Sequence, residues 1–292
     1  MVKVRRQAAG DSKVSIAECV SAIDAIDMLP EVAMRVIRMT EDPSSTAARL
    51  NDIVLHDPAL SSRILKVVNS PFYGLPGHVT SVERAIVLLG MTAVRNIAVA
   101  ASMGRLFRNV RLCDGLTTRD LWRHCILVAV AAAELAKCLK QSTVDEAFFS
   151  GMIHDIGLLA IVQTTPDKAR EAFKRASTLD VDLCTIEQDL LGFDHQQLGA
   201  ALAEHWRFPR NCQLAASHHH RPAELAEDVR GGVMLIYVAD TLCARAGSGF
   251  TLSASRQKIE EDDLACCNLS GRIVRQLAAN FPKLAESAGA FL

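Results

Sequence analysis

The sequence predicts an all-α protein. Half of its 292 residues are apolar, which is enough to bury a large core. Only 9 prolines and 16 glycines interrupt the chain, and the apolar positions recur at the spacing of amphipathic helices. Alternating strand patterns are essentially absent, and no repeat of solenoid length is visible. Long helices joined by few turns are therefore the expected architecture.

The first part of the chain predicts a helical subdomain over residues 16–112, after a polar and basic segment, residues 1–15, that we expect to be flexible. Asp57 before Pro58 has the residue types of an N-cap and a first helical turn. Ser81, followed by an acid two residues later, is a second helix start. The expected helices span residues 32–39, 50–54, 60–68, 81–90 and 91–107.

Aromatic residues in this region allow two interpretations. Residues 69–74 (NSPFYG) break the helical pattern and predict a loop. Phe72 and Tyr73 would make it a binding loop, or else a hydrophobic turn that holds the N-terminal helices together, which we favour. Trp122 and Trp206 are expected to anchor the core.

A polar connector at residues 108–118 predicts a boundary, followed by a helical bundle over residues 113–247. Residues 248–292 are expected to form an exposed loop and a C-terminal helix over residues 262–285. The expected helices of the bundle span residues 120–140, 144–163, 167–178, 181–191, 196–206, 209–220 and 223–246, the last with a break at Gly231-Gly232.

Charge and cysteine content exclude several classes of protein. The 32 basic and 33 acidic residues nearly balance, so there is no electrostatic case for binding nucleic acid or an anionic membrane. The nine cysteines show no C-x-x-C spacing, as expected for reduced thiols. No secretory segment is visible, and the longest apolar run, residues 125–133, is far shorter than the ~20 residues that cross a bilayer. We expect a cytoplasmic protein.

Seven of the nine histidines lie between His124 and His220. In the same region, His154 and Asp155 are the only ionisable residues of an apolar helix, and Asp240 is a lone acid in another. A buried carboxylate costs several kcal/mol unless a cation, a hydrogen-bond donor or a metal compensates it. Such residues can meet in a bundle core as a metal site. Alternatively, Asp155 caps or bonds a neighbouring helix and His154 is a satisfied core imidazole, because a His-Asp dipeptide alone is a weak signal.

A series of motifs favours the first of these alternatives. They are Leu29-Pro30, HDPAL (56–60), NSPFYG (69–74), SVERAIVLLG (81–90), LWRH (121–124), FFSGMIHDIGLL (148–159), GFDHQQLGAALAEHWRFP (192–209), HHRP (219–222) and VAD (238–240). Occurring in this order, they resemble the HDOD family, which is similar to the HD phosphohydrolases and the HD-GYP cyclic di-GMP phosphodiesterases. The tail after residue 250 carries no matching motif. The resemblance implies that residues 113–247 form an HD-like bundle.

The resemblance also implies a set of metal ligands: His124, His154, Asp155, His195, His219, His220 and Asp240. Neighbouring helical residues point about 100° apart, so one of His218, His219 and His220 is expected to face solvent. We favour His219 and His220 as ligands because they precede Arg221-Pro222, where the helix ends. A mixed set of histidines and carboxylates suits one or two Fe, Mn or Mg ions better than a closed Zn site.

Two departures from the HD-GYP pattern bear on activity. Leu158 follows Gly157 where those enzymes carry a lysine, and RPAELAED (221–228) replaces their GYP loop. These departures favour a non-enzymatic regulatory module that relays a signal by binding a signalling protein or a ligand such as a nucleotide. The alternative is a metal-dependent phosphohydrolase or phosphodiesterase acting on a nucleotide or cyclic dinucleotide. No catalytic residue is assigned with confidence; activity, if present, would depend on Asp155.

Overall fold

The computed structural model describes residues 14–25, 31–39, 44–104, 107, 110–113, 115–140 and 144–292. Most of these residues are helical, and their strands are confined to one short hairpin, so the predicted all-α class is confirmed. Residues 1–13 of the predicted flexible segment and the Leu29-Pro30 motif lie outside the described residues.

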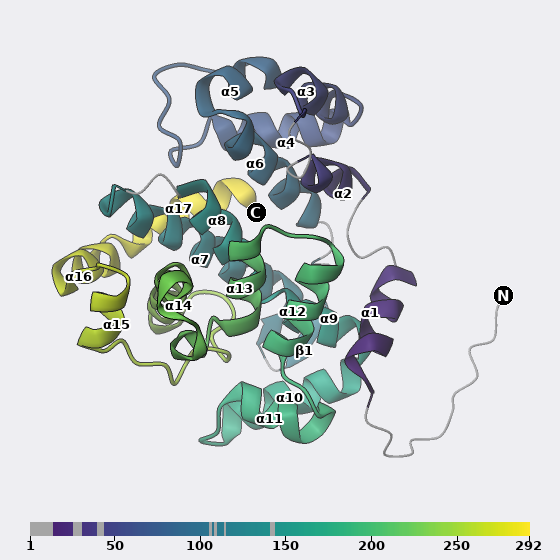
Figure 1. Cartoon of the computed structure of the whole chain (residues 1–292), viewed down its shortest axis with the longest axis vertical. Coiled ribbons are helices and arrows are strands. Elements are labelled where there is room, and N and C mark those ends of the chain that lie inside the picture. Colours follow the sequence, from purple (N-terminus) through teal and green to yellow (C-terminus); the bar gives the residue numbers. More distant parts are fainter. Residues whose placement is uncertain are drawn as a thin grey trace.

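The N-terminal helices gather around α6, which is buried along most of its length and contacts α2, α4 and α5. Figure 1 shows α3, α4 and α5 at one end of the molecule. The first helix, α1, packs instead on α9 and α12 of the bundle. The helices are α1 (Ile16–Ala25), α2 (Glu31–Arg38), α3 (Ala47–Leu55), α4 (Pro58–Val68), α5 (Val82–Leu89) and α6 (Met91–Met103).

The predicted helix starts are confirmed, and residues 69–74 form a turn. Asp57 Oδ1 accepts a hydrogen bond from the Leu60 amide at 2.9 Å. The side-chain amide of Asn69 donates to the carbonyl of Val79 at 2.9 Å and closes the loop. The Phe72 ring lies 5.7 Å from that of Phe148 in α8. The Asn69 bond favours the interpretation of a hydrophobic turn that holds the N-terminal helices together, and Phe72 also packs on α8 of the bundle.

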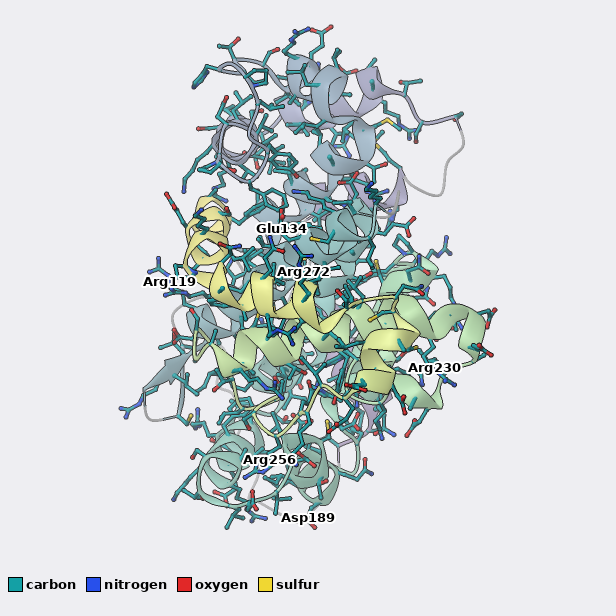
Figure 2. The ribbon with its side chains drawn as sticks, turned by 90° about the vertical axis from the view of Figure 1, so that its left-hand side faces the viewer. Arg119, Glu134, Asp189, Arg230, Arg256 and Arg272 are labelled. Carbon is teal, nitrogen blue, oxygen red and sulfur yellow. The ribbon has the colours of Figure 1, made fainter. Side chains whose placement is uncertain are left out.

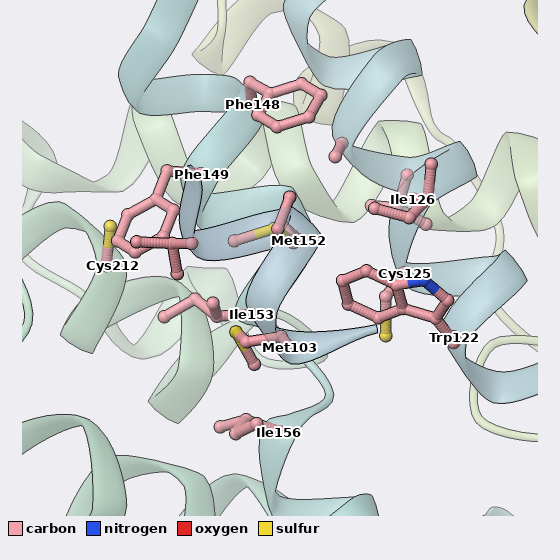
Figure 3. Packing of buried hydrophobic residues seen from close by; sticks show 14 of the residues in the cluster. Met103, Trp122, Cys125, Ile126, Phe148, Phe149, Met152, Ile153, Ile156 and Cys212 are labelled. Atoms are coloured by element: carbon pink, nitrogen blue, oxygen red, sulfur yellow. The ribbon is translucent and has the colours of Figure 1, made fainter. Parts of the chain in front are cut away.

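The second part of the chain is a helical bundle around α7, which contacts α8 and α14 most extensively. Figure 3 shows the apolar layer in which Met103 of α6 lies near Trp122 of α7 and Met152 of α8. Trp122 and Trp206 are both buried, as predicted. The helices are α7 (Thr118–Cys138), α8 (Val144–Ile153), α9 (Ile156–Thr164), α10 (Pro166–Thr178), α11 (Leu183–Leu191), α12 (His195–His205), α13 (Arg210–His218), the 3₁₀ turn η1 (Pro222–Glu224) and α14 (Glu227–Arg245).

The C-terminal segment folds back onto the bundle. Short helices α15 (Glu261–Cys266), α16 (Gly271–Ala279) and α17 (Phe281–Ala288) end in the 3₁₀ turn η2 (Gly289–Phe291). Helix α15 contacts α14, whereas α16 and α17 lie along α7, as the yellow ribbon shows in Figures 1 and 2.

Three local predictions were wrong, and one short element was not foreseen. The single helix expected over residues 144–163 is broken between α8 and α9, at His154 and Asp155. The break expected at Gly231-Gly232 does not occur, because α14 packs on α7 and α13 and continues through both glycines. The terminal helix expected over residues 262–285 is three helices, with Asn268 in a left-handed conformation after the first. The connector holds an antiparallel hairpin, β1 (Arg111–Cys113) and β2 (Leu116–Thr117).

The close approach of α9 to α12 depends on Gly157. A Cβ atom on this residue would lie 1.9 Å from the carbonyl oxygen of His195 and 2.9 Å from the amide nitrogen of Gly199. Both obstacles are backbone, so they cannot move aside as a flexible side chain would. Glycine is therefore required where the chain leaves Asp155 and meets the first turn of α12.

Replacing Gly157 with alanine is expected to lower the free energy of unfolding by about 2–3 kcal/mol, because the backbone must shift to admit the methyl group. The matched control is Gly232→Ala in α14, where a Cβ meets nothing within 4 Å. That substitution is expected to stabilise the protein by up to about 1 kcal/mol through helix propensity. Urea unfolding monitored by circular dichroism measures both. Equal stability of the two variants would contradict the steric argument.

Candidate metal centre

The break between α8 and α9 presents His154 and Asp155 to the protein interior. Asp155 occupies the N-cap position of α9, yet its side chain makes no capping hydrogen bond. Its carboxylate is instead turned toward the bundle core, and the residue is 1% exposed. The alternative in which Asp155 caps a helix is therefore excluded for α9.

Four further elements bring the remaining predicted residues to the same place. His124 lies on α7, His195 is the first residue of α12, and Asp240 lies on α14; all three are fully buried. His219 and His220 follow α13 directly. His219 is fully buried, whereas His218 is partly exposed and bonds Ser217 Oγ at 2.6 Å. The preference for His219 and His220 over His218 thus agrees with the geometry.

The first group of side chains, here called the first half-site, contains His124, His154, Asp155 and Asp240. His124 Nε2 lies 3.0 Å from Asp240 Oδ1, and His154 Nε2 lies 3.3 Å from Asp155 Oδ2. Despite this proximity, neither His124 nitrogen and neither Asp240 oxygen has a hydrogen-bond partner. Nitrogen and oxygen atoms that lie this close together without hydrogen-bond geometry are expected of side chains that bind one metal ion.

The second half-site contains Asp155, His195, His219 and His220. His219 Nε2 lies 3.2 Å and His195 Nε2 3.5 Å from Asp155 Oδ1. His220 Nε2 lies 3.0 Å from His195 Nε2. Each of these four residues offers one ligand atom. The four atoms lie within 4.8 Å of one another, close enough to share an ion. The same description holds for His124, His154 and Asp155 in the first half-site.

Asp155 joins the two half-sites through different oxygen atoms. Its Oδ2 faces His124 and His154, at 3.8 and 3.3 Å, whereas its Oδ1 faces His195 and His219. A carboxylate with one oxygen directed at each of two donor groups has the arrangement of a bridging ligand. All seven predicted residues are thus brought together around this one side chain.

Hydrogen bonds at the outer nitrogens fix the orientation of three rings. His154 Nδ1 donates to the Gly151 carbonyl at 2.7 Å, and His219 Nδ1 to the Ala215 carbonyl at 2.9 Å. His195 Nδ1 lies 2.7 Å from Glu187 Oε2. A carbonyl or carboxylate only accepts, so these bonds place a proton on Nδ1 and direct Nε2 into the site.

Glu187 was missed by the sequence analysis. It is fully buried in α11, and its Oε2 also accepts the backbone N–H of His195 at 2.8 Å. The available signal was its spacing: Leu183, Glu187 and Leu191 are four residues apart, which puts an acid on the apolar face of an amphipathic helix. Its role is to hold His195.

Burial and charge oppose one another in setting the ionisation of the site. Burial lowers the pKa of His219 and, more strongly, that of His220, so both rings are neutral. Burial also acts to lower the pKa of His154, but the neighbouring carboxylates of Asp155 and Asp240 outweigh it and raise this pKa to about 9. For Asp155, burial raises the pKa but His154 dominates and holds it well below its usual range. A metal ion would displace the proton of His154 on binding.

The donor set fits a divalent metal centre. Among the described residues, nine buried side-chain nitrogen or oxygen atoms lack a hydrogen-bond partner, and six of them belong to His124, His154, Asp155 and Asp240. Unpaired buried polar atoms are costly, and a cation is the partner that would satisfy lone pairs and carboxylates together. Imidazole and carboxylate groups together are ligands of divalent metal ions.

A cavity of about 820 Å³ adjoins the second half-site. His220 and Gln196 form part of its wall on the side of the half-site, and Arg221, Tyr237 and Lys258 line it farther out. The volume lies in the range of small-molecule sites. His220 is the one predicted ligand that contacts this cavity, among the residues that the structure describes.

Comparison with known proteins agrees with this fold. The HDOD domain family matches residues 26–222, about two thirds of the chain. The chain belongs to the HDOD family. An HDOD domain protein of unknown function from Geobacter sulfurreducens has a TM-score of 0.78 at 18% identity, covering 95% of this chain and 99% of that one. A protein from Shewanella amazonensis SB2B, provisionally named a phosphohydrolase, has a TM-score of 0.72 at 24% identity, covering 94% and 98%.

A curated relative is longer than this HDOD chain. An uncharacterized protein from Treponema pallidum (strain Nichols) is 22% identical over 209 residues, or 71% of this chain, but the match spans 40% of that protein's length. Within the described residues, Val144–Thr164 is apolar and long enough to cross a membrane, yet 83% of its apolar window is buried inside the fold, as in a core helix of a soluble protein.

Removing divalent metal is expected to destabilise the protein, because an ion bound to the folded state alone stabilises it by mass action. An ion at 100 times its Kd adds about 2.7 kcal/mol, so saturating EDTA should lower the Tm by about 5 °C. Differential scanning calorimetry with and without chelator measures this. Asp155→Ala is the control, since it removes the shared ligand and should make the Tm insensitive to EDTA. An unchanged wild-type Tm would argue for a metal-free site.

Proposed function

We propose that this HDOD protein is a metal-dependent phosphohydrolase whose centre is held by His124, His154, Asp155, His195, His219, His220 and Asp240. The observation that carries the proposal is Asp155, which directs one carboxylate oxygen at each half-site. Divalent ions in such a site supply Lewis acidity toward a phosphoryl group and acidify water. Fe or Mn is favoured by the donor set, with Mg as the third candidate.

The protein's own residues hold and orient this centre. Gly151, Ala215 and Glu187 accept hydrogen bonds from the outer ring nitrogens and keep the inner nitrogens directed into the centre. Burial keeps bulk water away from the first half-site, where His124 and Asp240 are fully buried. The cavity that His220 lines therefore supports an approach of substrate from the side of the second half-site.

The cavity supports a polar phosphoester as the class of substrate. Its wall combines side-chain amides, such as Gln188 and Gln196, with the phenol of Tyr237 and the cations of Arg221 and Lys258. Such a surface suits the sugar and phosphate of a nucleotide or cyclic dinucleotide. Its acids are partly neutralised, since Asp194 pairs with Arg221 at 2.6 Å.

The second candidate is a regulatory protein. In it the metal centre responds to a ligand or stabilises the fold, and it does not turn over substrate. Leu158, where HD-GYP enzymes carry lysine, is fully buried, so this position contributes nothing to substrate binding. The residues that replace the GYP loop form the short turn η1 and the start of α14. A cytoplasmic signalling protein or a nucleotide would then be the binding partner.

Turnover distinguishes the two candidates. Protein loaded with Mn²⁺ is expected to hydrolyse at least one member of a panel of nucleotides, cyclic dinucleotides and nitrophenyl phosphates. Asp155→Ala should abolish this activity because both half-sites lose a ligand. His205→Ala is the matched control, since this exposed histidine pairs with Asp24 outside the centre and should leave turnover unchanged. Bound metal without hydrolysis of any member would favour the regulatory candidate.

A further inference from the structure

Residues 247–260, the segment between α14 and α15, lie beyond the HDOD match and border the second half-site; we call this segment the strap. Near its start, Phe250 is fully buried and its N–H donates to the Asp120 carbonyl of α7 at 3.1 Å. Near its end, the Arg256 guanidinium pairs with Asp180 at 2.9 Å, at the end of the molecule seen in Figure 2. The strap is therefore held on both sides of the centre.

Two strap side chains contact residues of the centre. Ser253 Oγ lies 3.4 Å from Asp155 Oδ2, and the side-chain amide of Gln257 bonds His220 Nδ1. Both also line the large cavity. The strap thus forms the wall between the second half-site and the space through which a ligand would enter.

His220 differs from the other rings of the second half-site in its outer partner. His195 and His219 bond a carboxylate and a backbone carbonyl, groups that only accept and so fix the proton on Nδ1. His220 bonds the amide of Gln257, which has a donor end and an acceptor end of nearly the same shape. The proton position on His220 therefore depends on which end of the amide faces it.

In the orientation present in the structure, the amide NH₂ faces His220, and a continuous chain of donors results. Thr241 Oγ donates to Gln257 Oε1 at 2.7 Å, and Gln257 donates to His220 Nδ1. When His195 carries only its Nδ1 proton, His220 Nε2 carries a proton and donates to His195 Nε2 at 3.0 Å, while His195 Nδ1 donates to Glu187 Oε2 at 2.7 Å. Each of these hydrogen-bonding atoms has a partner, but a protonated Nε2 has no lone pair for an ion.

Turning the amide over produces a second arrangement, which is satisfied on the strap side but gives up the hydrogen bond between His220 Nε2 and His195 Nε2. Gln257 Oε1 then accepts from His220 Nδ1, and the amide NH₂ donates to Thr241. The Thr241 hydroxyl keeps an acceptor, because the Tyr237 carbonyl lies 2.8 Å away. No hydrogen bond is lost on the strap side, and His220 Nε2 now offers its lone pair to the second half-site.

We infer that Gln257 is a positioning residue that sets the tautomer of His220 and so determines whether the second half-site can take its ion. The inference rests on the proposed metal centre. It assigns to the strap, outside the HDOD match, a part in completing that centre.

The variants that test this role differ in what they present to His220. Gln257→Glu offers an acceptor only, and Gln257→Leu offers neither donor nor acceptor. Lys258→Met is the matched control, because this exposed neighbour lines the same cavity and, within the described residues, its side chain makes no hydrogen bond or ion pair to a predicted ligand. Circular dichroism and urea unfolding establish that each variant is folded before it is compared.

Nitrogen-15 NMR of histidine-labelled, metal-free protein gives the first readout, which a merely structural role would not change. The wild type and Lys258→Met are expected to carry the His220 proton on Nε2, whereas Gln257→Glu should carry a proton on Nδ1. An unprotonated Nδ1 in Gln257→Glu would overturn the inference. This readout needs no bound metal, so it decides the role of Gln257 even if the wild type binds none and the proposed function fails.

Titration with Mn²⁺ gives the second readout, with calorimetry for affinity and the electron paramagnetic resonance signal of coupled ions for the pair. The wild type, Lys258→Met and Gln257→Glu are expected to bind two ions. Gln257→Leu should keep the first ion and bind the second about 10- to 100-fold more weakly, the usual effect of removing a partner of a ligand histidine. Wild-type affinity for both ions in Gln257→Leu would overturn the inference.

Discussion

The structure of the bundle depends on one buried carboxylate. Asp155 is 1% exposed and its pKa is held well below its usual range, so a negative charge lies in the apolar interior. Such a charge is tolerated only where several partners compensate it. The chain satisfies this requirement by breaking the long apolar helix at that point and by directing imidazoles from α7, α8, α12 and the end of α13 toward it.

Two sets of groups surround this charge: one set lies next to Asp155, and the other lies behind the first and orients it. Around Asp155 lie the imidazoles of the two half-sites, whose N–H groups would compensate the charge directly and whose lone pairs would hold a compensating cation. Behind them lie groups that fix the rings, such as Glu187 at His195 and the Gly151 carbonyl at His154. The glycine at position 157 allows α12 to approach so closely that His195 faces Asp155. The close backbone contact at Gly157 and the position of the Asp155 charge therefore depend on each other.

The sequence predicted the fold class from local helical spacing, and it singled out His154, Asp155 and Asp240 as polar residues in apolar helices, whereas the full set of seven ligands came from the resemblance to the HDOD family. A lone acid in an apolar helix, such as Asp240, is visible without knowledge of its neighbours. Glu187 and Gln257 were missed for the opposite reason: one lies on a helix with ordinary surface acids, and the other in a polar loop without periodicity. The break at Asp155 was also invisible, since apolar residues continue on both sides. Packing on α7 likewise carries α14 through Gly231-Gly232, against local propensity.

The position of Gln257 connects the two candidate functions. Its amide lies between His220 on one side and Thr241 of α14 on the other, and it lines the cavity. Under the proposed tautomer control, occupancy of the second half-site turns the amide over and reorients the Thr241 hydroxyl toward Tyr237. A ligand in the cavity that bonds the amide would bias the same equilibrium, because linkage between two sites is reciprocal. A hydrolase centre and a ligand-responsive regulatory centre can thus use the same residues. In either case, a signal would pass between the cavity and the second half-site through the strap.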